Sequence, residues 1–345
     1  MRPTNDMDKN IFAKAIETIR KGNKFLVVSH VNPEGDAVGS LLGMALALRA
    51  AGKDVTAYLE DPVPTAFRFL PGADTVVNSL EGTGQFDITI AVDCGQKDRL
   101  GRGFMALIDP GVIINLDHHM TNTGFGDINI IMAEASAAGE VIYDLLKAAS
   151  MEITKDVAVN LYAAIHTDTG SFRYSSSTPE SFIKAGELVR LGAEPWQVAM
   201  QVYENHPAKK YKLLGMVLGT LDIVEISNRR NPVNIATLVL TFDMLKKAGA
   251  DKDLADGFVN YARGIEGVEA GLLFREARFN EYKISMRSKG EINVAVVAGM
   301  FGGGGHSNAA GCTIRGTLDE VKERLVGALR DSLAAGRQVK ENAPS

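Results

Sequence analysis

The strongest constraint on the fold is an alternation of short β-rich runs with helical segments, in which several runs end in charged residues. KFLVVSH ends at His30, and the helical segment SLLGMALALRAAGK and a further run, DVTAYLE, follow it. FDITIAVDCG and VIINLDHHMTN repeat the apolar pattern and carry Asp93 and Asp117 near their ends. Strand, helix and strand in this order indicate βαβ units, so we predict an α/β protein with a parallel, Rossmann-like sheet.

Acidic residues and histidines gather where these predicted strands end and where the helical segment VAVNLYAAIHTDTGSF ends. Ligands of an open parallel sheet bind beyond the carboxyl ends of its strands, so we expect these side chains to meet. The candidates are His30, Glu34, Asp36, Asp93, Asp117, His118, His119 and Asp168. A single aspartate at a strand end is more often a cap or turn residue, but clusters on four successive elements favour a functional site.

The residue types in this set point to metal chemistry. Mixed imidazole and carboxylate ligands favour Mn²⁺, Fe²⁺ or Zn²⁺ over Mg²⁺ and Ca²⁺, which prefer oxygen alone. The number of carboxylates exceeds what a mononuclear zinc site uses. Two ions roughly 3.5–4 Å apart that share one carboxylate would use this set and hold a bridging hydroxide for attack on phosphorus.

A second block of strand-like runs contains four consecutive glycines. We predict one amphipathic connecting helix from about Pro195 to Gly219, and a strand for NVAVVAG, just before the glycines. The substrate-binding candidates in GMFGGGGHSNAAG are Gly303, Gly304, Gly305 and His306. Glycines let backbone N–H groups approach an anion closely, and His306 can add a donor. Arg287, in KISMRS, offers a guanidinium suited to phosphate.

The chain length allows two domains, because single hydrophobic cores rarely grow past about 250 residues, and this chain has 345. We predict a metal-binding catalytic domain at residues 1–195, a connecting helix at 196–220 and a smaller α/β domain at 221–335. Residues 336–345 are polar and are predicted to be a disordered tail.

Composition narrows the possible partners. The net charge of −5 argues against a binder of long duplex nucleic acid but leaves small anionic ligands open. Cys94 and Cys312 are the only cysteines and lie far apart, so neither a disulfide framework nor a CxxC zinc site is expected. No run approaches the roughly 18 apolar residues of a membrane span, and the first thirty residues do not read as a signal peptide. We therefore expect a cytoplasmic protein that does not associate with membranes.

Five motifs occur in the order typical of one family. HVNPEGDAVGS, VDCG, LDHH, TDTGSF and GGGGHSNAAG together resemble the DHH phosphoesterase family, in the branch with the DHH-associated C-terminal domain. The resemblance spans about residues 25–330. That branch includes nano-RNases, which also act as phosphatases on 3′-phosphoadenosine 5′-phosphate (pAp), and cyclic-dinucleotide phosphodiesterases.

The resemblance implies two cations that share one aspartate. For one ion it implies the ligands His30, Glu34 and Asp93. For the other it implies Asp36, Asp93, His118 and Asp168. His119 would then face the substrate phosphate as a donor to the scissile group, and Asp117 would orient a neighbouring histidine. The family usually has aspartate at the position of Glu34, whose extra methylene moves the carboxylate by more than an ångström.

The resemblance also implies an activity. We expect a hydrolase that uses two Mn²⁺ ions to cleave short oligoribonucleotides, such as pApA and pGpG to mononucleotides, and that can also act on pAp. The second domain would close over the metal site and bind the substrate in an inter-domain cleft through Arg287 and the glycine-rich segment. A two-domain chain of this kind could form a homodimer.

Three other activities remain to be separated from this one. A cyclic-dinucleotide phosphodiesterase acting on cyclic di-AMP would use the same catalytic residues. A nucleotide sensor without turnover is favoured only by Glu34. A family II-type pyrophosphatase shares the metal motifs but would carry a lysine- and arginine-rich clamp in place of GGGGHSNAAG.

Overall fold

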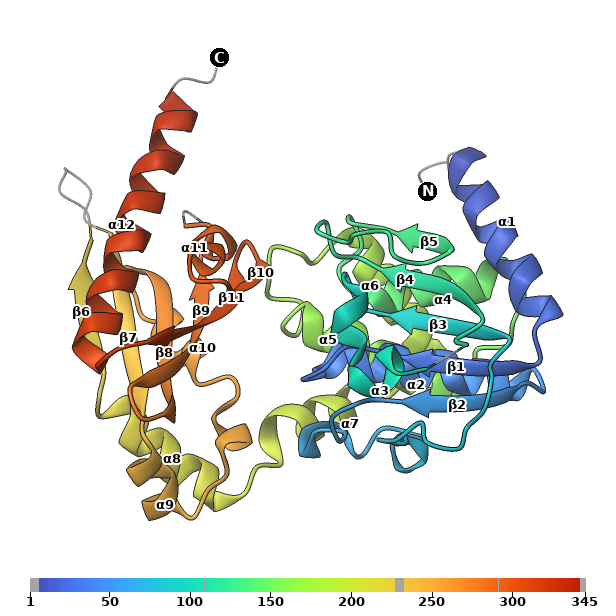
Figure 1. The fold of residues 1–345 in the computed structure, drawn as a ribbon, viewed down its shortest axis with the longest axis horizontal. Helices are drawn as coiled ribbons and strands as arrows, with labels where there is room; N and C mark the ends of the chain where they lie inside the picture. Colours follow the sequence, from blue (N-terminus) through green and yellow to red (C-terminus); the bar gives the residue numbers. More distant parts are fainter. Residues whose placement is uncertain (1–5, 108, 227–232, 291, 342–345) are drawn as a thin grey trace. The chain divides into compact units, whose positions relative to one another are not determined.

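The computed structural model of the protein describes residues 6–107, 109–226, 233–290 and 292–341. The chain divides into two units, Met1–Asn205 and His206–Ser345 (Figure 1). This division falls inside the segment 196–220, which was predicted to connect two domains. No helix in the described part of the chain is both long and apolar enough to cross a membrane.

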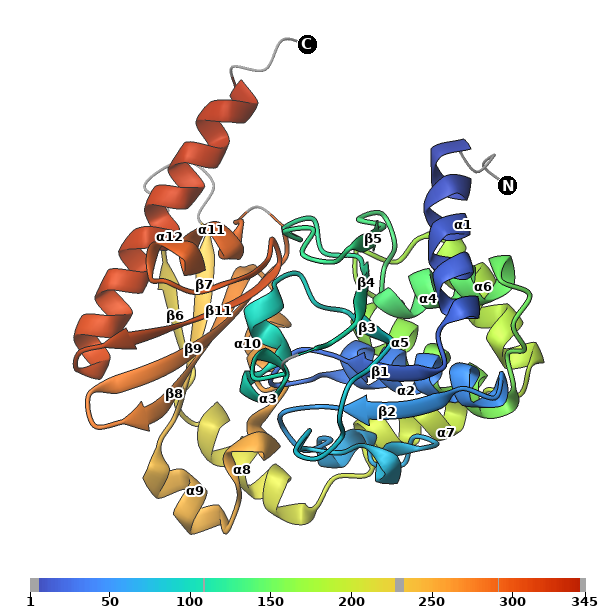
Figure 2. The same ribbon diagram turned by 45° about the vertical axis from the view of Figure 1, so that its right-hand side comes forward.

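The N-terminal unit contains a five-stranded parallel sheet in the order β2-β1-β3-β4-β5 (Figures 1 and 2). The strands are β1 (Lys24–Val28), β2 (Asp54–Tyr58), β3 (Ile88–Val92), β4 (Val112–Asp117) and β5 (Ile128–Ile131). The helices are α1 (Asp6–Lys21), α2 (Gly35–Ala50), α3 (Arg102–Met105), α4 (Ala138–Ala148), α5 (Lys155–Asp168), α6 (Pro179–Arg190) and α7 (Pro195–Ala199). The predicted α/β fold with a parallel sheet is therefore confirmed, and β5 adds a strand that the sequence pattern did not indicate.

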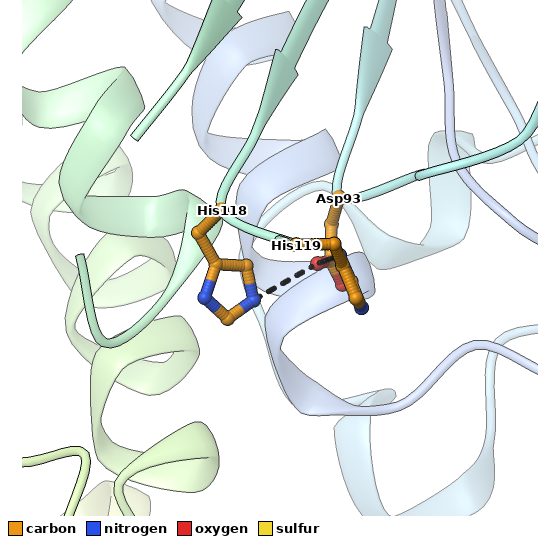
Figure 3. A group of neighbouring side chains, drawn as sticks. All are labelled: Asp93, His118 and His119. Atoms are coloured by element: carbon orange, nitrogen blue, oxygen red, sulfur yellow. Dashed lines mark ion pairs between the residues drawn. The ribbon is translucent and has the colours of Figure 1, made fainter. Parts of the chain in front are cut away.

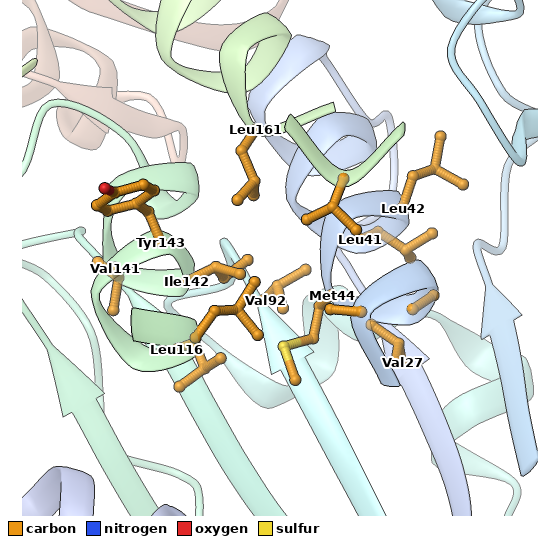
Figure 4. Packing of buried hydrophobic residues seen from close by; sticks show 14 of the residues in the cluster. Val27, Leu41, Leu42, Met44, Val92, Leu116, Val141, Ile142, Tyr143 and Leu161 are labelled. Atoms are coloured by element: carbon orange, nitrogen blue, oxygen red, sulfur yellow. The ribbon is translucent and has the colours of Figure 1, made fainter. Parts of the chain in front are cut away.

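The core of this unit lies between one face of the sheet and helices α2, α4 and α5. Val27, Val92 and Leu116 project from neighbouring strands toward Leu41 of α2 and Leu161 of α5 (Figure 4). All five side chains are fully buried. Burial of a valine or leucine side chain contributes roughly 1.5–3 kcal/mol, so this layer fixes the helices against the strand ends.

Glycines at every fourth position of α2 allow it to pack closely on α5. A Cβ atom at Gly39 would lie 2.5 Å from the Asn160 carbonyl oxygen, and one at Gly43 would lie 2.7 Å from the Leu161 side chain. A Cβ at Gly35 would overlap the side chain of Thr167. The small residues of HVNPEGDAVGS therefore bring the start of α2 against the end of α5.

The C-terminal unit contains a six-stranded mixed sheet in the order β10-β11-β9-β8-β7-β6, in which only β7 and β8 pair in parallel. Its strands are β6 (Asp222–Glu225), β7 (Asn234–Leu240), β8 (Val268–Arg278), β9 (Glu281–Ser288), β10 (Gly304–His306) and β11 (Ala309–Arg315). Its helices are α8 (Ala208–Leu218), α9 (Phe242–Ala248), α10 (Val259–Arg263), α11 (Val294–Met300) and α12 (Leu318–Glu341). One face of the sheet packs on α11 and α12, and the other packs on α8 and α10.

Two predicted elements were wrong. NVAVVAG forms helix α11 and not a strand, and the Asn293 side chain caps it by accepting hydrogen bonds from the N–H groups of Ala295 and Val296. A short apolar run does not distinguish a buried strand from a buried helix. The connecting segment is not one helix: α7 continues into a π-helical turn, Met200–Glu204, and α8 begins after Pro207, because proline cannot continue a helix.

The end of the chain also differs from the prediction. Helix α12 extends through residues 336–341, which the polar composition assigned to a disordered tail. Residues 336–341 contain no proline, and four of these six residues (Arg337, Gln338, Lys340 and Glu341) are good helix formers. Residues 342–345 lie outside the described residues.

Candidate metal centre

The predicted ligands converge at the carboxyl edge of the N-terminal sheet. Asp93 follows β3 directly, His118 and His119 follow β4, and His30 lies just beyond β1. Figure 3 shows Asp93 and His118 extending toward each other from the ends of two neighbouring strands. Two helices each add one predicted carboxylate: Asp36 lies near the start of α2, and Asp168 lies at the end of α5.

Asp93 lies at the centre of the group. Its Oδ2 is 3.5 Å from His30 Nε2, and its Oδ1 is 3.5 Å from His118 Nε2. The carboxylate is buried, and within the described part of the chain neither oxygen has a hydrogen-bond partner. The Asp93 backbone has a φ of 51°, in the left-handed region that non-glycine residues adopt infrequently. A buried carboxylate with two open oxygens, each facing a different histidine, fits a ligand shared by two cations.

A second aspartate and the end of α5 complete one ligand group around His118. His118 Nε2 lies 3.6 Å from Asp36 Oδ2 and 3.7 Å from Asp168 Oδ2. Donor atoms of these three residues lie within 4.8 Å of one another, close enough to hold a single metal ion. His118 Nδ1 lies 3.2 Å from the Ala135 carbonyl oxygen. Donation of the Nδ1 proton to that oxygen leaves the Nε2 lone pair directed at the carboxylates, the tautomer that a metal ligand requires.

The other ligand group contains His30, Glu34 and Asp93. His30 Nε2 lies 2.9 Å from Glu34 Oε1, and His30 Nδ1 lies 2.9 Å from the Val31 carbonyl oxygen. Glu34 is 56% exposed, whereas the other members are buried. The longer glutamate side chain therefore still reaches the group, but from its solvent side.

His119 and Asp117 form a separate pair beside the two groups. His119 Nδ1 lies 2.7 Å from Asp117 Oδ1, and the carboxylate of Asp117 is fully buried. His119 Nδ1 also lies 3.7 Å from Asp93 Oδ1. Burial disfavours a charged imidazole, but the hydrogen bond to Asp117 and the charges of Asp93 and Asp117 together outweigh it and raise the pKa of His119. The pair therefore favours a doubly protonated His119 whose Nε2–H can donate.

The carboxylates are too crowded to be ionised together without a compensating cation. Burial and the neighbouring Asp93 raise the pKa of Asp36 well above its usual range, and burial raises the pKa of Asp168 to about 7. Burial opposes charge on His118, but Asp93 and Asp36 raise its pKa. Divalent cations would replace the shared protons, so the electrostatics fit the metal groups that the geometry defines.

The predicted substrate residues of the C-terminal unit lie in one row across its sheet. Arg287 of β9 pairs with Ala309 of β11, and Ala309 pairs with His306 of β10. Directly paired residues project from the same face of a sheet, so Arg287 and His306 flank the small Ala309 side chain. His306 is exposed and Arg287 is partly exposed.

The three glycines predicted to bind substrate, Gly303, Gly304 and Gly305, differ in how much space surrounds them. A Cβ at Gly303 would lie 2.2 Å from the Gly311 carbonyl oxygen, and one at Gly305 would lie 2.4 Å from that of Ala309. Close packing on β11 therefore requires both. A Cβ at Gly304 would meet nothing within 4 Å, so only this position is left open toward a ligand.

Several groups that contact the predicted ligands were not among the residues predicted from the sequence. The Arg99 guanidinium lies 3.2 Å from His30 Nδ1, and the Asp36 carboxylate accepts hydrogen bonds from Ser40 and from the backbone N–H groups of Ala138 and Gly139. Backbone groups have no residue identity to detect. Of these groups, Ser40 lies inside the motif HVNPEGDAVGS, so the motif could have indicated it.

Comparison with known proteins identifies the family. Residues 24–165 match the N-terminal domain of the DHH family, and residues 232–335 match the DHHA1 domain. The bifunctional oligoribonuclease and PAP phosphatase NrnA of Thermus thermophilus is 32% identical over 308 residues, which cover 89% of each chain. The chain belongs to the DHH phosphoesterase family. As a member of this family, the protein is a hydrolase of phosphoester bonds.

Two further relatives extend the likeness over the whole chain. NrnA of Bacillus subtilis, which bears the same description, is 26% identical over 302 residues, covering 87% of this chain and 92% of its own. The crystal structure of an exopolyphosphatase-related protein from Bacteroides fragilis has a TM-score of 0.86 and 27% identity, and covers 98% of this chain and 99% of its own. The family members therefore share both units of this chain.

Proposed function

We propose that the protein is a Mn²⁺-dependent phosphoesterase of short nucleotides. Its substrates would be linear dinucleotides such as pApA and pGpG, cleaved to mononucleotides, and pAp, cleaved to its monophosphate. The observation that carries the proposal is the buried Asp93 carboxylate, whose two open oxygens face His30 and His118. The names of the Thermus and Bacillus relatives, both oligoribonucleases and PAP phosphatases, support the substrate class.

The ligand set favours manganese. One ion would be held by His30, Glu34 and Asp93, and the other by Asp36, Asp93, His118 and Asp168. Histidine nitrogens suit Mn²⁺ better than Mg²⁺, which prefers oxygen ligands. When bound, such a pair of ions polarises the phosphoryl group, lowers the pKa of water and stabilises the charge of the leaving oxygen.

The protein's own side chains would position and protonate the substrate. Asp117 holds the His119 ring and favours its doubly protonated form, so that His119 Nε2–H can donate to the scissile phosphate or to the leaving oxygen. In the C-terminal unit, Arg287 would bind the non-scissile phosphate, and His306 with the open backbone at Gly304 would add donors.

A substrate panel tests the proposal. The full chain would be incubated with pApA, pGpG, pAp, cyclic di-AMP and pyrophosphate, each with Mn²⁺, with Mg²⁺ and without metal, and the products would be separated by chromatography. We expect Mn²⁺-dependent conversion of the linear dinucleotides, with dephosphorylation of pAp. Preferential opening of cyclic di-AMP would replace the proposal with a cyclic-dinucleotide phosphodiesterase. Absence of turnover with every substrate would leave a nucleotide sensor.

A further inference from the structure

One backbone segment contacts two of the metal-binding side chains at once. The Ala135 carbonyl oxygen lies 3.2 Å from His118 Nδ1. The Ala138 N–H donates to Asp36 Oδ2 at 2.6 Å, and the Gly139 N–H donates to Asp36 Oδ1 at 3.1 Å. Residues 135–139, which end in the first turn of α4, therefore orient both His118 and Asp36, two of the three residues of one ligand group.

A buried glutamate next to this segment anchors it. Glu140 is 1% exposed, and its Oε1 accepts hydrogen bonds from both the backbone N–H and the hydroxyl of Ser136. The same oxygen accepts a hydrogen bond of 2.9 Å from the hydroxyl of Ser181 on α6. Its Oε2 lies 3.2 Å from Lys184 Nζ, also on α6. Glu140 thereby ties the segment to a neighbouring helix through both of its oxygens.

A buried carboxylate of this kind is costly, and packing alone does not require it. Removing a carboxylate from water costs several kcal/mol, and well-packed apolar residues commonly replace buried ion pairs without loss of stability. Glu140 instead makes directional bonds to Ser136, which lies between the Ala135 carbonyl and the N–H groups that hold Asp36. The direction of these bonds, more than their strength, is what an apolar residue could not supply.

We propose that Glu140 is a positioning residue for the cation bound by Asp36, His118 and Asp168. By fixing Ser136, it sets the Ala135 carbonyl that orients the His118 ring and the N–H groups of α4 that orient the Asp36 carboxylate. The inference rests on the proposed two-metal site, and it assigns to Glu140, Ser136 and Ser181 a role that none of the five sequence motifs contains.

Titration of the metal-free full chain with Mn²⁺ by calorimetry tests the inference. The variants are Glu140→Gln, which keeps the shape but changes the hydrogen-bonding pattern, and Ser136→Ala, which removes one hydroxyl. Asp144→Asn is the matched control, because Asp144 pairs with the same Lys184 on the same two helices, whereas the hydrogen bonds to Ser136 come from Glu140. Thermal unfolding of each metal-free variant reports its folding separately.

We expect Glu140→Gln to weaken binding of one Mn²⁺ ion by about tenfold to a hundredfold, the usual cost of losing a group that orients a metal ligand. Ser136→Ala should lie at the lower end of that range, and the ion bound by His30, Glu34 and Asp93 should be affected less. Asp144→Asn should bind both ions as the wild type does, even if its thermal stability falls.

The outcomes separate this inference from the proposed function. Wild-type affinity for both ions in Glu140→Gln and Ser136→Ala, together with lower thermal stability of the metal-free protein, would show that Glu140 only joins α4 to α6 and would overturn the inference. If Glu140→Gln does not fold, Ser136→Ala decides alone. If the wild-type protein binds fewer than two ions, the proposed function itself fails, whatever the variants do.

Discussion

The proposed metal centre of the N-terminal unit and the proposed substrate row of the C-terminal unit are built in opposite ways. The proposed metal ligands come from strand ends and helix ends that are far apart in sequence, and most are buried close to one another. Arg287 and His306 lie on β9 and β10, on either side of β11, and strand register places them in one row on the same face of the sheet. The first arrangement is interlocked in the interior, and the second is a row on the face of a sheet.

The two regions should therefore respond differently to substitution. In the metal centre, the loss of one side chain leaves the others buried and unbalanced, so the effects of two substitutions should not add. On the sheet face, each side chain keeps its own access to solvent and ligand, so the effects of two substitutions should multiply. The predictions below test this contrast.

The largest expected effect is that of Asp93→Asn. Turnover of pApA should fall by about a thousandfold or more, because metal ions supply several kcal/mol of transition-state stabilisation and roughly 1.4 kcal/mol corresponds to a factor of ten. The double variant with His118→Asn should be no slower than Asp93→Asn alone. The measurement is kcat/KM in Mn²⁺, with Asp243→Asn, an exposed aspartate on α9, as the control. Multiplying losses in the double variant would contradict an interlocked centre.

A smaller effect is expected for Arg287→Ala. Loss of a charge-assisted hydrogen bond to phosphate costs about 1.5–3 kcal/mol, so KM for pApA should rise by roughly tenfold to a hundredfold with little change in kcat. Combination with His306→Ala should multiply the two separate increases. Arg278→Ala, at an exposed arginine of β8, is the control and should leave KM unchanged. A loss confined to kcat would show that Arg287 acts in catalysis and not in binding.

Packing beneath the metal centre should be sensitive to one methyl group. Gly39→Ala introduces a Cβ 2.5 Å from the Asn160 carbonyl oxygen and should lower the free energy of unfolding by about 1–3 kcal/mol, measured with urea. Gly186→Ala on α6 is the matched control, because its Cβ meets nothing within 4 Å, and it should raise stability by up to about 1 kcal/mol. Equal effects at both positions would argue that α2 and α5 can separate without cost.

The smallest effect is expected for Glu34→Asp. Glu34 is 56% exposed, and exposed ion pairs contribute at most about 1 kcal/mol, so the dissociation constant of the nearer Mn²⁺ ion should change by less than about tenfold. Calorimetric titration with Mn²⁺ measures this change. If the wild-type protein showed no turnover and Glu34→Asp restored it, Glu34 would be identified as the residue that prevents catalysis.

The sequence predicted the part of the site in which residue type and position along the chain both carry information. Asp93 and His118 follow apolar runs, and parallel strands place their carboxyl ends together, so their meeting could be foreseen. The segment 135–139 could not be foreseen, because it acts through backbone groups. NVAVVAG was mistaken for a strand because its apolar run suits either structure, and only the capping side chain of Asn293 distinguishes the two.

Packing between elements also explains why several motif positions are glycine. The glycines Gly35 and Gly39 of HVNPEGDAVGS allow α2 to approach α5. Likewise, Gly303 and Gly305 serve the contact between β10 and β11, and only Gly304 is open. Such reasons depend on which elements become neighbours in the fold, which one sequence does not reveal.

Anomalous diffraction from crystals grown with Mn²⁺ would test the central claim most directly. We expect two manganese peaks per chain, with the Asp93 carboxylate coordinating both ions, His30 on one side and His118 on the other. A single peak, or two peaks of which only one contacts Asp93, would contradict a centre built around a shared carboxylate.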